Sequence, residues 1–109
     1  MNNTNYKFGE VHTLSDQVEQ NENNVQFRNI FETGNGGVAL LAFKAGQKLD
    51  THLASTEVMV TVLQGEIEFT MLDRKHTICE NQFLLMGANV PHSVVANKDS
   101  KVMLVKVKN

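Results

Sequence analysis

The chain has 109 residues, of which 41% are hydrophobic and 20% are charged, and its formal net charge is −2. This length holds one domain, and the composition excludes a disordered or fibrous protein. The ten basic residues are scattered and no apolar stretch approaches the roughly 18 residues of a membrane span, so we expect neither a nucleic-acid nor a membrane partner. The polar N-terminus lacks the apolar segment of a secretory signal, which predicts a cytoplasmic protein.

The chain divides into a polar arm and a domain rich in β-strands. Residues 1–24 are rich in Asn, Gln, Glu and Asp and predict an arm, whereas residues 25–109 predict a β-barrel domain. Alternation of apolar and polar residues begins at residue 25, and the glycine-rich run at residues 34–37 predicts a hairpin turn. Residues 38–44 are apolar on both faces, which is typical of a strand covered on each side by a second sheet or by another subunit.

The rest of the chain contains short segments of strand character separated by turn residues. The expected strands cover residues 57–64, 66–72, 75–78, 82–86, 92–96 and 101–108. No segment of useful length has the period of a helix. Many short, evenly spaced strands with turn signals between them indicate a sandwich or a barrel.

The stretch that begins at Gly46 resembles the first sequence motif of the cupin superfamily. In that motif a glycine is followed by a His-x-His pair, a glutamate and a second glycine. Gly46 and His52 match the spacing. Ala54 stands at the second histidine position and Val58 at the glutamate position, while Glu57 lies one residue away.

Residues 81–96 resemble the second cupin motif, with His92 on its histidine position. Asn81 and Asn89 occupy two glycine positions, and after Gly, Asn best tolerates the left-handed backbone that such turns require. The resemblance implies an all-β fold, a cupin-type double-stranded β-helix (jelly-roll) barrel of short antiparallel strands. It is the fold of a small single-domain cupin with a degenerate metal-binding motif.

The resemblance also implies what the site contains. In cupins the motif histidines and the glutamate point into the barrel and bind a divalent transition metal, which here would be Zn, Ni, Fe or Mn. Only His52 and His92 remain in phase, and Glu57 is a third ligand only if the loop after His52 shifts its register. Two imidazoles alone bind metal loosely. The alternative is that each histidine is a structural residue hydrogen-bonded to a backbone carbonyl.

The leading hypothesis is a small-molecule-binding module, non-catalytic or weakly catalytic, in which the two histidines orient a polar or anionic ligand. The expected pocket residues are His52, Ala54, Val58, Val60, Val62, Phe83, Met86 and His92. The alternative is a metal-dependent enzyme, an oxygenase, isomerase or lyase acting on a small organic acid or sugar. A third hypothesis is a sensor similar to the ligand-binding barrels of sugar-responsive bacterial regulators. In each case we expect a homodimer, because a strand apolar on both faces needs a cover.

Overall fold

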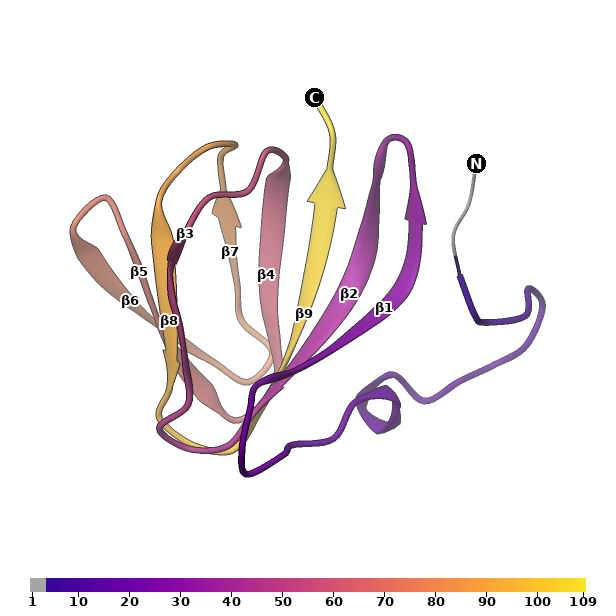
Figure 1. Cartoon of the computed structure of the whole chain (residues 1–109), viewed down its shortest axis with the longest axis horizontal. Coiled ribbons are helices and arrows are strands. Elements are labelled where there is room, and N and C mark those ends of the chain that lie inside the picture. Colours follow the sequence, from indigo (N-terminus) through magenta and orange to yellow (C-terminus); the bar gives the residue numbers. More distant parts are fainter. Residues whose placement is uncertain (1–3) are drawn as a thin grey trace.

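Two antiparallel β-sheets face each other and form a barrel that is open at one end (Figure 1). The computed structural model describes residues 4–109. The five-stranded sheet has the order β1-β2-β9-β4-β7, and the four-stranded sheet has the order β3-β8-β5-β6. The strands are β1 (Gln26–Thr33), β2 (Gly36–Phe43), β3 (Lys48–His52), β4 (Glu57–Gln64), β5 (Glu66–Met71), β6 (Arg74–Cys79), β7 (Phe83–Met86), β8 (His92–Ala96) and β9 (Ser100–Val107). The expected all-β jelly-roll barrel is confirmed.

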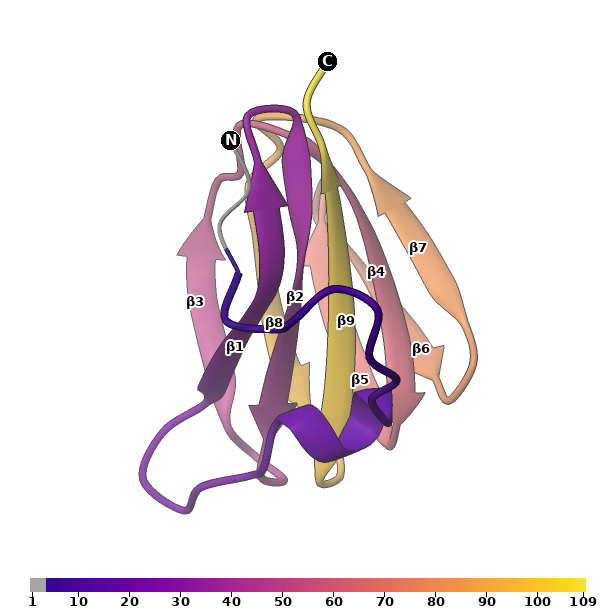
Figure 2. The ribbon, with the colours of Figure 1, turned by 90° about the vertical axis from the view of Figure 1, so that its right-hand side faces the viewer.

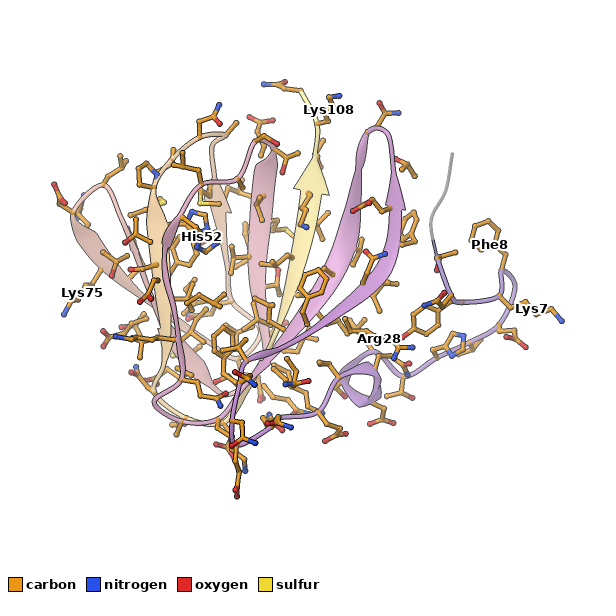
Figure 3. All side chains as sticks on the ribbon, viewed as in Figure 1. Lys7, Phe8, Arg28, His52, Lys75 and Lys108 are labelled. Carbon is orange, nitrogen blue, oxygen red and sulfur yellow. The ribbon has the colours of Figure 1, made fainter. Side chains whose placement is uncertain are left out.

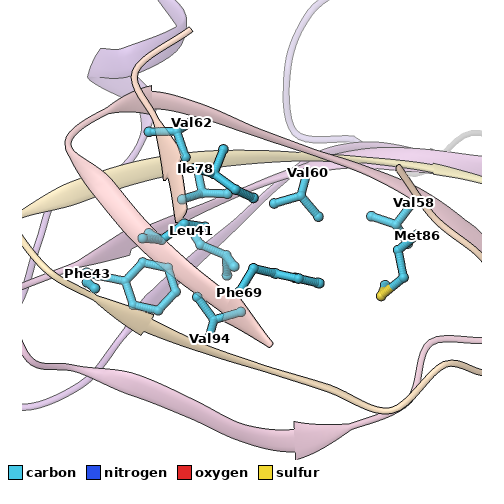
Figure 4. Close-up of a cluster of buried hydrophobic side chains, with 12 residues drawn as sticks. Leu41, Phe43, Val58, Val60, Val62, Phe69, Ile78, Met86 and Val94 are labelled. Carbon is cyan, nitrogen blue, oxygen red and sulfur yellow. The ribbon is translucent and has the colours of Figure 1, made fainter. Parts of the chain in front are cut away.

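The core lies between the two sheets and follows from alternation along the strands. On β4 the buried residues Val58, Val60 and Val62 alternate with side chains of the opposite face, and they meet Ile67 and Phe69 of β5. Figure 4 shows this cluster, in which valines and phenylalanines from both sheets pack with Leu41, Ile78 and Met86. Burial of apolar area contributes roughly 25 cal/mol for each Å² removed from water, so this face of each strand stabilises the closed barrel.

Strand β3 is the one strand of the described chain for which sequence analysis had no expectation. Its residues Lys48–His52 are mostly exposed, and only Leu49 is partly buried. The strand lies at the edge of the four-stranded sheet, where it pairs with β8 alone. An edge strand needs no continuous apolar face, and its alternation is therefore weak in the sequence.

Turns with a left-handed backbone connect the strands where the sequence predicted them. Asn81 and Asn89 have φ angles of 67° and 61°, which confirms that asparagine fills the steric role of glycine in the second motif. Gly65 has a φ of 89°, and a side chain there would collide with the Ser100 hydroxyl and the Asp99 carbonyl. This turn between β4 and β5 therefore requires glycine.

The polar arm packs on the outer face of the five-stranded sheet. It contains one short 3₁₀ helix, η1 (Leu14–Gln17), and crosses β2 and β9 (Figure 2). Val18 of the arm is 6% exposed and packs with Leu40 and Ala42, the outward-facing residues of β2. Lys101 Nζ donates a hydrogen bond of 2.6 Å to the Ser15 carbonyl. The outer face of β2 is thus covered from within the same chain.

This arrangement bears on the expected homodimer, which stays a prediction. The strand that suggested it is covered by the arm on one face and by the core on the other. Large apolar side chains that stay exposed on the five-stranded sheet lie elsewhere, on β1, on β7 and at the end of β9, and include Phe27, Phe31, Phe83, Leu85 and Val107. Within residues 4–109, no helix is long and apolar enough to cross a membrane.

Docking of the arm should contribute to stability through Val18. We expect Val18→Ala to lower the free energy of unfolding by about 2 kcal/mol, because it removes two buried methyl groups and leaves a cavity. The matched control is Val11→Ala, since Val11 lies in the same arm and is 99% exposed. This control should change stability by less than about 0.5 kcal/mol. Urea denaturation measures both, and equal effects would show that the arm is not docked.

Candidate functional site

His52 and His92 meet at the open end of the barrel. They lie opposite each other on the antiparallel strands β3 and β8. Their ring centroids are 4.0 Å apart and their planes are inclined by 59°. Figure 3 shows His52 in the upper half of the barrel, on β3 at the edge of the four-stranded sheet. The structure therefore brings together two imidazoles from residues that are forty positions apart in the sequence.

A β-bulge in β3 creates this pairing. Leu49 lies opposite Val94, and His52 lies opposite His92, so β3 advances by three residues while β8 advances by two. Regular pairing would put Thr51 opposite His92 and would turn His52 to the outer face, because side chains alternate along a strand. With the bulge, Leu49 and His52 both line the interior cavity. Bulges commonly re-aim a side chain in this way.

Backbone carbonyls fix both imidazole rings. Nδ1 of His52 donates to the Asp50 carbonyl over 2.8 Å, and Nδ1 of His92 donates to the Val90 carbonyl over 3.0 Å. A carbonyl oxygen only accepts, so in the neutral rings the proton sits on Nδ1 and Nε2 keeps its lone pair. Neither Nε2 atom has a hydrogen-bond partner among residues 4–109. The pair therefore offers two acceptors to a molecule in the cavity.

His92 is held in its neutral form. It is 6% exposed and stacks on the ring of Phe69, with centroids 5.4 Å apart and planes inclined by 12°. Burial lowers the pKa of His92 below its ordinary value of 6.5, and positive charge on His52 lowers it further. The hydrogen bond to Val90 opposes this shift but does not cancel it. At neutral pH His92 is consequently an uncharged acceptor.

The two histidines border a cavity of about 530 Å³. This volume lies within the range of roughly 300–1,000 Å³ that is usual for small-molecule sites. Most of its lining is aliphatic or aromatic, and its polar lining residues are His52, Ser55, Thr56, His92 and Lys106. No Asp or Glu of the described chain lines it. The cavity suits a small molecule with an apolar body and few polar groups.

Six of the eight expected pocket residues line this cavity: His52, Ala54, Val58, Val60, Met86 and His92. Val62 does not, because it is fully buried in the core on the same face of β4, farther from the start of that strand. Phe83 does not either, and it is 62% exposed. On β7 the inward residues are Leu84 and Met86, so alternation turns Phe83 to the outer face.

Sequence analysis missed Lys106 and Phe27, which also line the cavity. Lys106 follows Val102 and Leu104 on the inward face of β9, and Phe27 lies on β1. The signal for Lys106 was available in the period of two that it shares with Val102 and Leu104. It was overlooked because a lysine near a basic C-terminus is ordinarily a surface residue.

The donor set does not fit the metal that the resemblance implies. Glu57 is exposed at the start of β4, opposite Val107, and does not line the cavity. Over residues 4–109, no three His, Cys, Asp or Glu side chains gather in a group that could hold a metal ion. Catalytic zinc sites keep three protein ligands, and His52 and His92 supply two.

The neutral form of His92 predicts how stability depends on pH. Because the folded-state pKa is lowered, the unfolded chain binds more protons near pH 6, and the free energy of unfolding should fall as pH decreases from about 7.5 to about 5.5. Urea denaturation across this range should give a smaller pH slope for His92→Gln than for the wild type. The control, His76→Gln, alters a histidine of β6 outside the cavity and should keep the slope. Equal slopes in all three proteins would refute the assignment.

The two-ligand donor set predicts weak metal binding. Elemental analysis of protein purified without chelator should find well under one equivalent of Zn, Ni, Fe or Mn, because a third protein ligand is missing. His52→Ala should leave this value unchanged. One equivalent of metal that is lost in His52→Ala would contradict the prediction and favour a metal-dependent enzyme.

Comparison with known proteins adds three findings. The family model described as the cupin domain matches residues 39–108. No curated protein matches the sequence. Among solved structures, a conserved protein of unknown function from Streptococcus pyogenes is 25% identical, with a TM-score of 0.88, and 97% of this chain and 93% of that chain are covered.

Two further structures show the same fold. A cupin superfamily protein from Desulfitobacterium hafniense is 19% identical, with a TM-score of 0.87 and 97% of each chain covered. An RmlC-like cupin from Desulfovibrio desulfuricans is 28% identical, with a TM-score of 0.80, and 90% of this chain and 95% of that chain are covered. The matched region includes His52, His92 and every strand from β3 to β9. The chain therefore belongs to the cupin family, as a small single-domain member with a degenerate metal-binding motif.

Proposed function

We propose that this protein is a small-molecule-binding cupin whose ligand enters the open end of the barrel and donates hydrogen bonds to His52 and His92. The observation that carries this proposal is the pair of Nε2 lone pairs at the cavity, each fixed by a hydrogen bond from Nδ1 to a backbone carbonyl. The ring centroids are 4.0 Å apart, so one hydroxyl or amide group of a ligand can donate to either ring.

The rest of the cavity supports binding more than proton transfer. The walls that face the histidines are apolar and include Val58, Val60 and Met86. They favour the burial of hydrocarbon and exclude water, which strengthens each hydrogen bond to the ligand. Both histidines stand on paired strands, so the acceptors are positioned before the ligand arrives and little ordering is needed on binding.

The two other hypotheses require groups that the described residues do not supply. A metal-dependent enzyme acting on an organic acid or sugar needs a third ligand beside His52 and His92, and Glu57 lies outside the cavity. A sensor role needs a partner that carries the output. Ligand binding is the activity for which the site is complete.

Binding should stabilise the fold and should depend on His52. In a panel of hydroxylated metabolites such as alcohols, sugars and hydroxy acids, a ligand present at a hundred times its Kd adds about 2.7 kcal/mol. For a domain of this size, that corresponds to a rise in Tm on the order of 10 °C. His52→Leu replaces the imidazole with an apolar side chain and so removes an acceptor. It should weaken ligand binding about tenfold and halve the rise in Tm.

The matched control is His76→Leu, which removes a histidine of β6 that does not line the cavity. It should leave the ligand-dependent rise in Tm unchanged. If no compound of the panel raises Tm in the wild type, or if both leucine variants reduce the rise equally, the proposed binding at the histidine pair is wrong.

A further inference from the structure

Lys106 is a charged residue built into the wall of the cavity. It lies two positions beyond Leu104 on β9, on the strand face that lines the cavity, and it is partly buried. Opposite it on β2 is Gly37, and on β4 its partner is Val58, which also lines the cavity. The ammonium nitrogen Nζ lies 5.7 Å from the centroid of the Phe27 ring on β1. This distance is that of a cation–π contact.

The charge of Lys106 is not neutralised within the described chain. Lys44, Lys48 and Lys101 each have a carboxylate oxygen within 4.0 Å, whereas for Lys106 no such contact occurs among residues 4–109. The Phe27 ring offers this ammonium attraction but no lone pair, so its N–H groups stay available to hydrogen-bond a ligand in the cavity.

The nearest carboxylates in the sheet do not neutralise the charge of Lys106. Glu32 lies opposite Gly37 on β1, and Glu57 lies opposite Val107 on β4, so both are close to Lys106 in the register of the sheet. Both are exposed and neither lines the cavity. Lys106 is therefore the only charged residue of the described chain on the cavity lining.

Taking the proposed function as its basis, we infer that the ligand is a small carboxylate with an apolar body, and that Lys106 binds its carboxylate. The ammonium supplies a charge-assisted hydrogen bond that gains strength from partial burial. Phe27 is 59% exposed at the cavity and packs over the hydrocarbon part of the ligand beside Lys106. The histidines accept a hydrogen bond from a separate donor group, so the cavity recognises an anion and a donor at different places.

A matched pair of probes tests this inference. Hexanoate and hexanamide share a hydrocarbon chain, and only hexanoate is an anion at pH 7.5, where its binding is measured by NMR titration of the ¹⁵N-labelled protein. We expect the wild type to bind hexanoate about tenfold more tightly than hexanamide. Lys106→Gln should weaken hexanoate about tenfold and change hexanamide less than about twofold, because the amide makes no ion pair.

Three further variants separate charge at this position from other effects. Lys108→Gln removes a lysine two residues later that is exposed and outside the cavity, and it should leave both affinities unchanged (Figure 3). Lys106→Arg keeps the charge and should retain the preference for hexanoate. Lys106→Met also removes the charge but keeps an apolar stem near Phe27, and it should lose the preference for hexanoate. This second neutral variant keeps the test valid if Lys106→Gln folds poorly.

The outcomes separate this inference from the proposed function. If wild type and Lys106→Gln bind hexanoate and hexanamide equally well, the assignment of the carboxylate to Lys106 is overturned, while binding in the cavity stands. If Lys108→Gln weakens hexanoate as much as Lys106→Gln does, a general surface attraction explains the result and the inference fails. If neither probe binds, the inference is wrong, and the metabolite panel alone decides the proposed function.

Discussion

The pairing of β3 with β8 across a one-residue bulge is the constraint on which the site depends. It places His52 directly opposite His92 and turns both rings toward one cavity. The bulge lies in the edge strand of the four-stranded sheet, where an extra residue disturbs the ladder on one side only. Leu49 keeps its contact with the core on the near side of the bulge. Anchoring of Leu49 and pairing of His52 together fix the geometry of the histidine pair.

The electrostatic character of the cavity follows from what surrounds its few polar groups. His92 is neutral because burial against Phe69 penalises the imidazolium, and charge on His52 adds to that penalty. His92 therefore acts as an acceptor, while Lys106 contributes a positive charge that no carboxylate of the described chain neutralises within 4.0 Å. Acceptors at one place and a cation at another define the polar groups that a complementary ligand carries.

Departures from the cupin motifs leave the cavity with two of the metal donors that the family motifs supply. Ala54 and Val58 line the cavity where the family motif has a histidine and a glutamate, so aliphatic groups replace two metal donors. Glu57 does not compensate for the missing carboxylate. Side chains alternate along β4, and because Val58 faces the cavity its neighbour Glu57 faces away from it. A carboxylate that is displaced by one residue along the strand therefore cannot coordinate a metal in the cavity.

The features that the sequence by itself determined depend on local pattern. Strands with a period of two, glycine and asparagine at left-handed turns, and the inward direction of His92 beside Val94 and Ala96 are set by near neighbours in the chain. The same alternation put Val58, Val60, Met86 and His92 on the strand faces that line the cavity. The division into arm and domain is likewise an interpretation of composition.

Tertiary structure alone decided the features that arise between strands. The bulge that turns His52 inward, the docking of Val18 on β2 and the recruitment of Lys106 to the cavity each depend on a partner distant in the sequence. Local alternation states which residues share a face. It does not state where an extra residue enters a ladder or how deep the cavity extends, because cross-strand pairing and side-chain packing set those quantities.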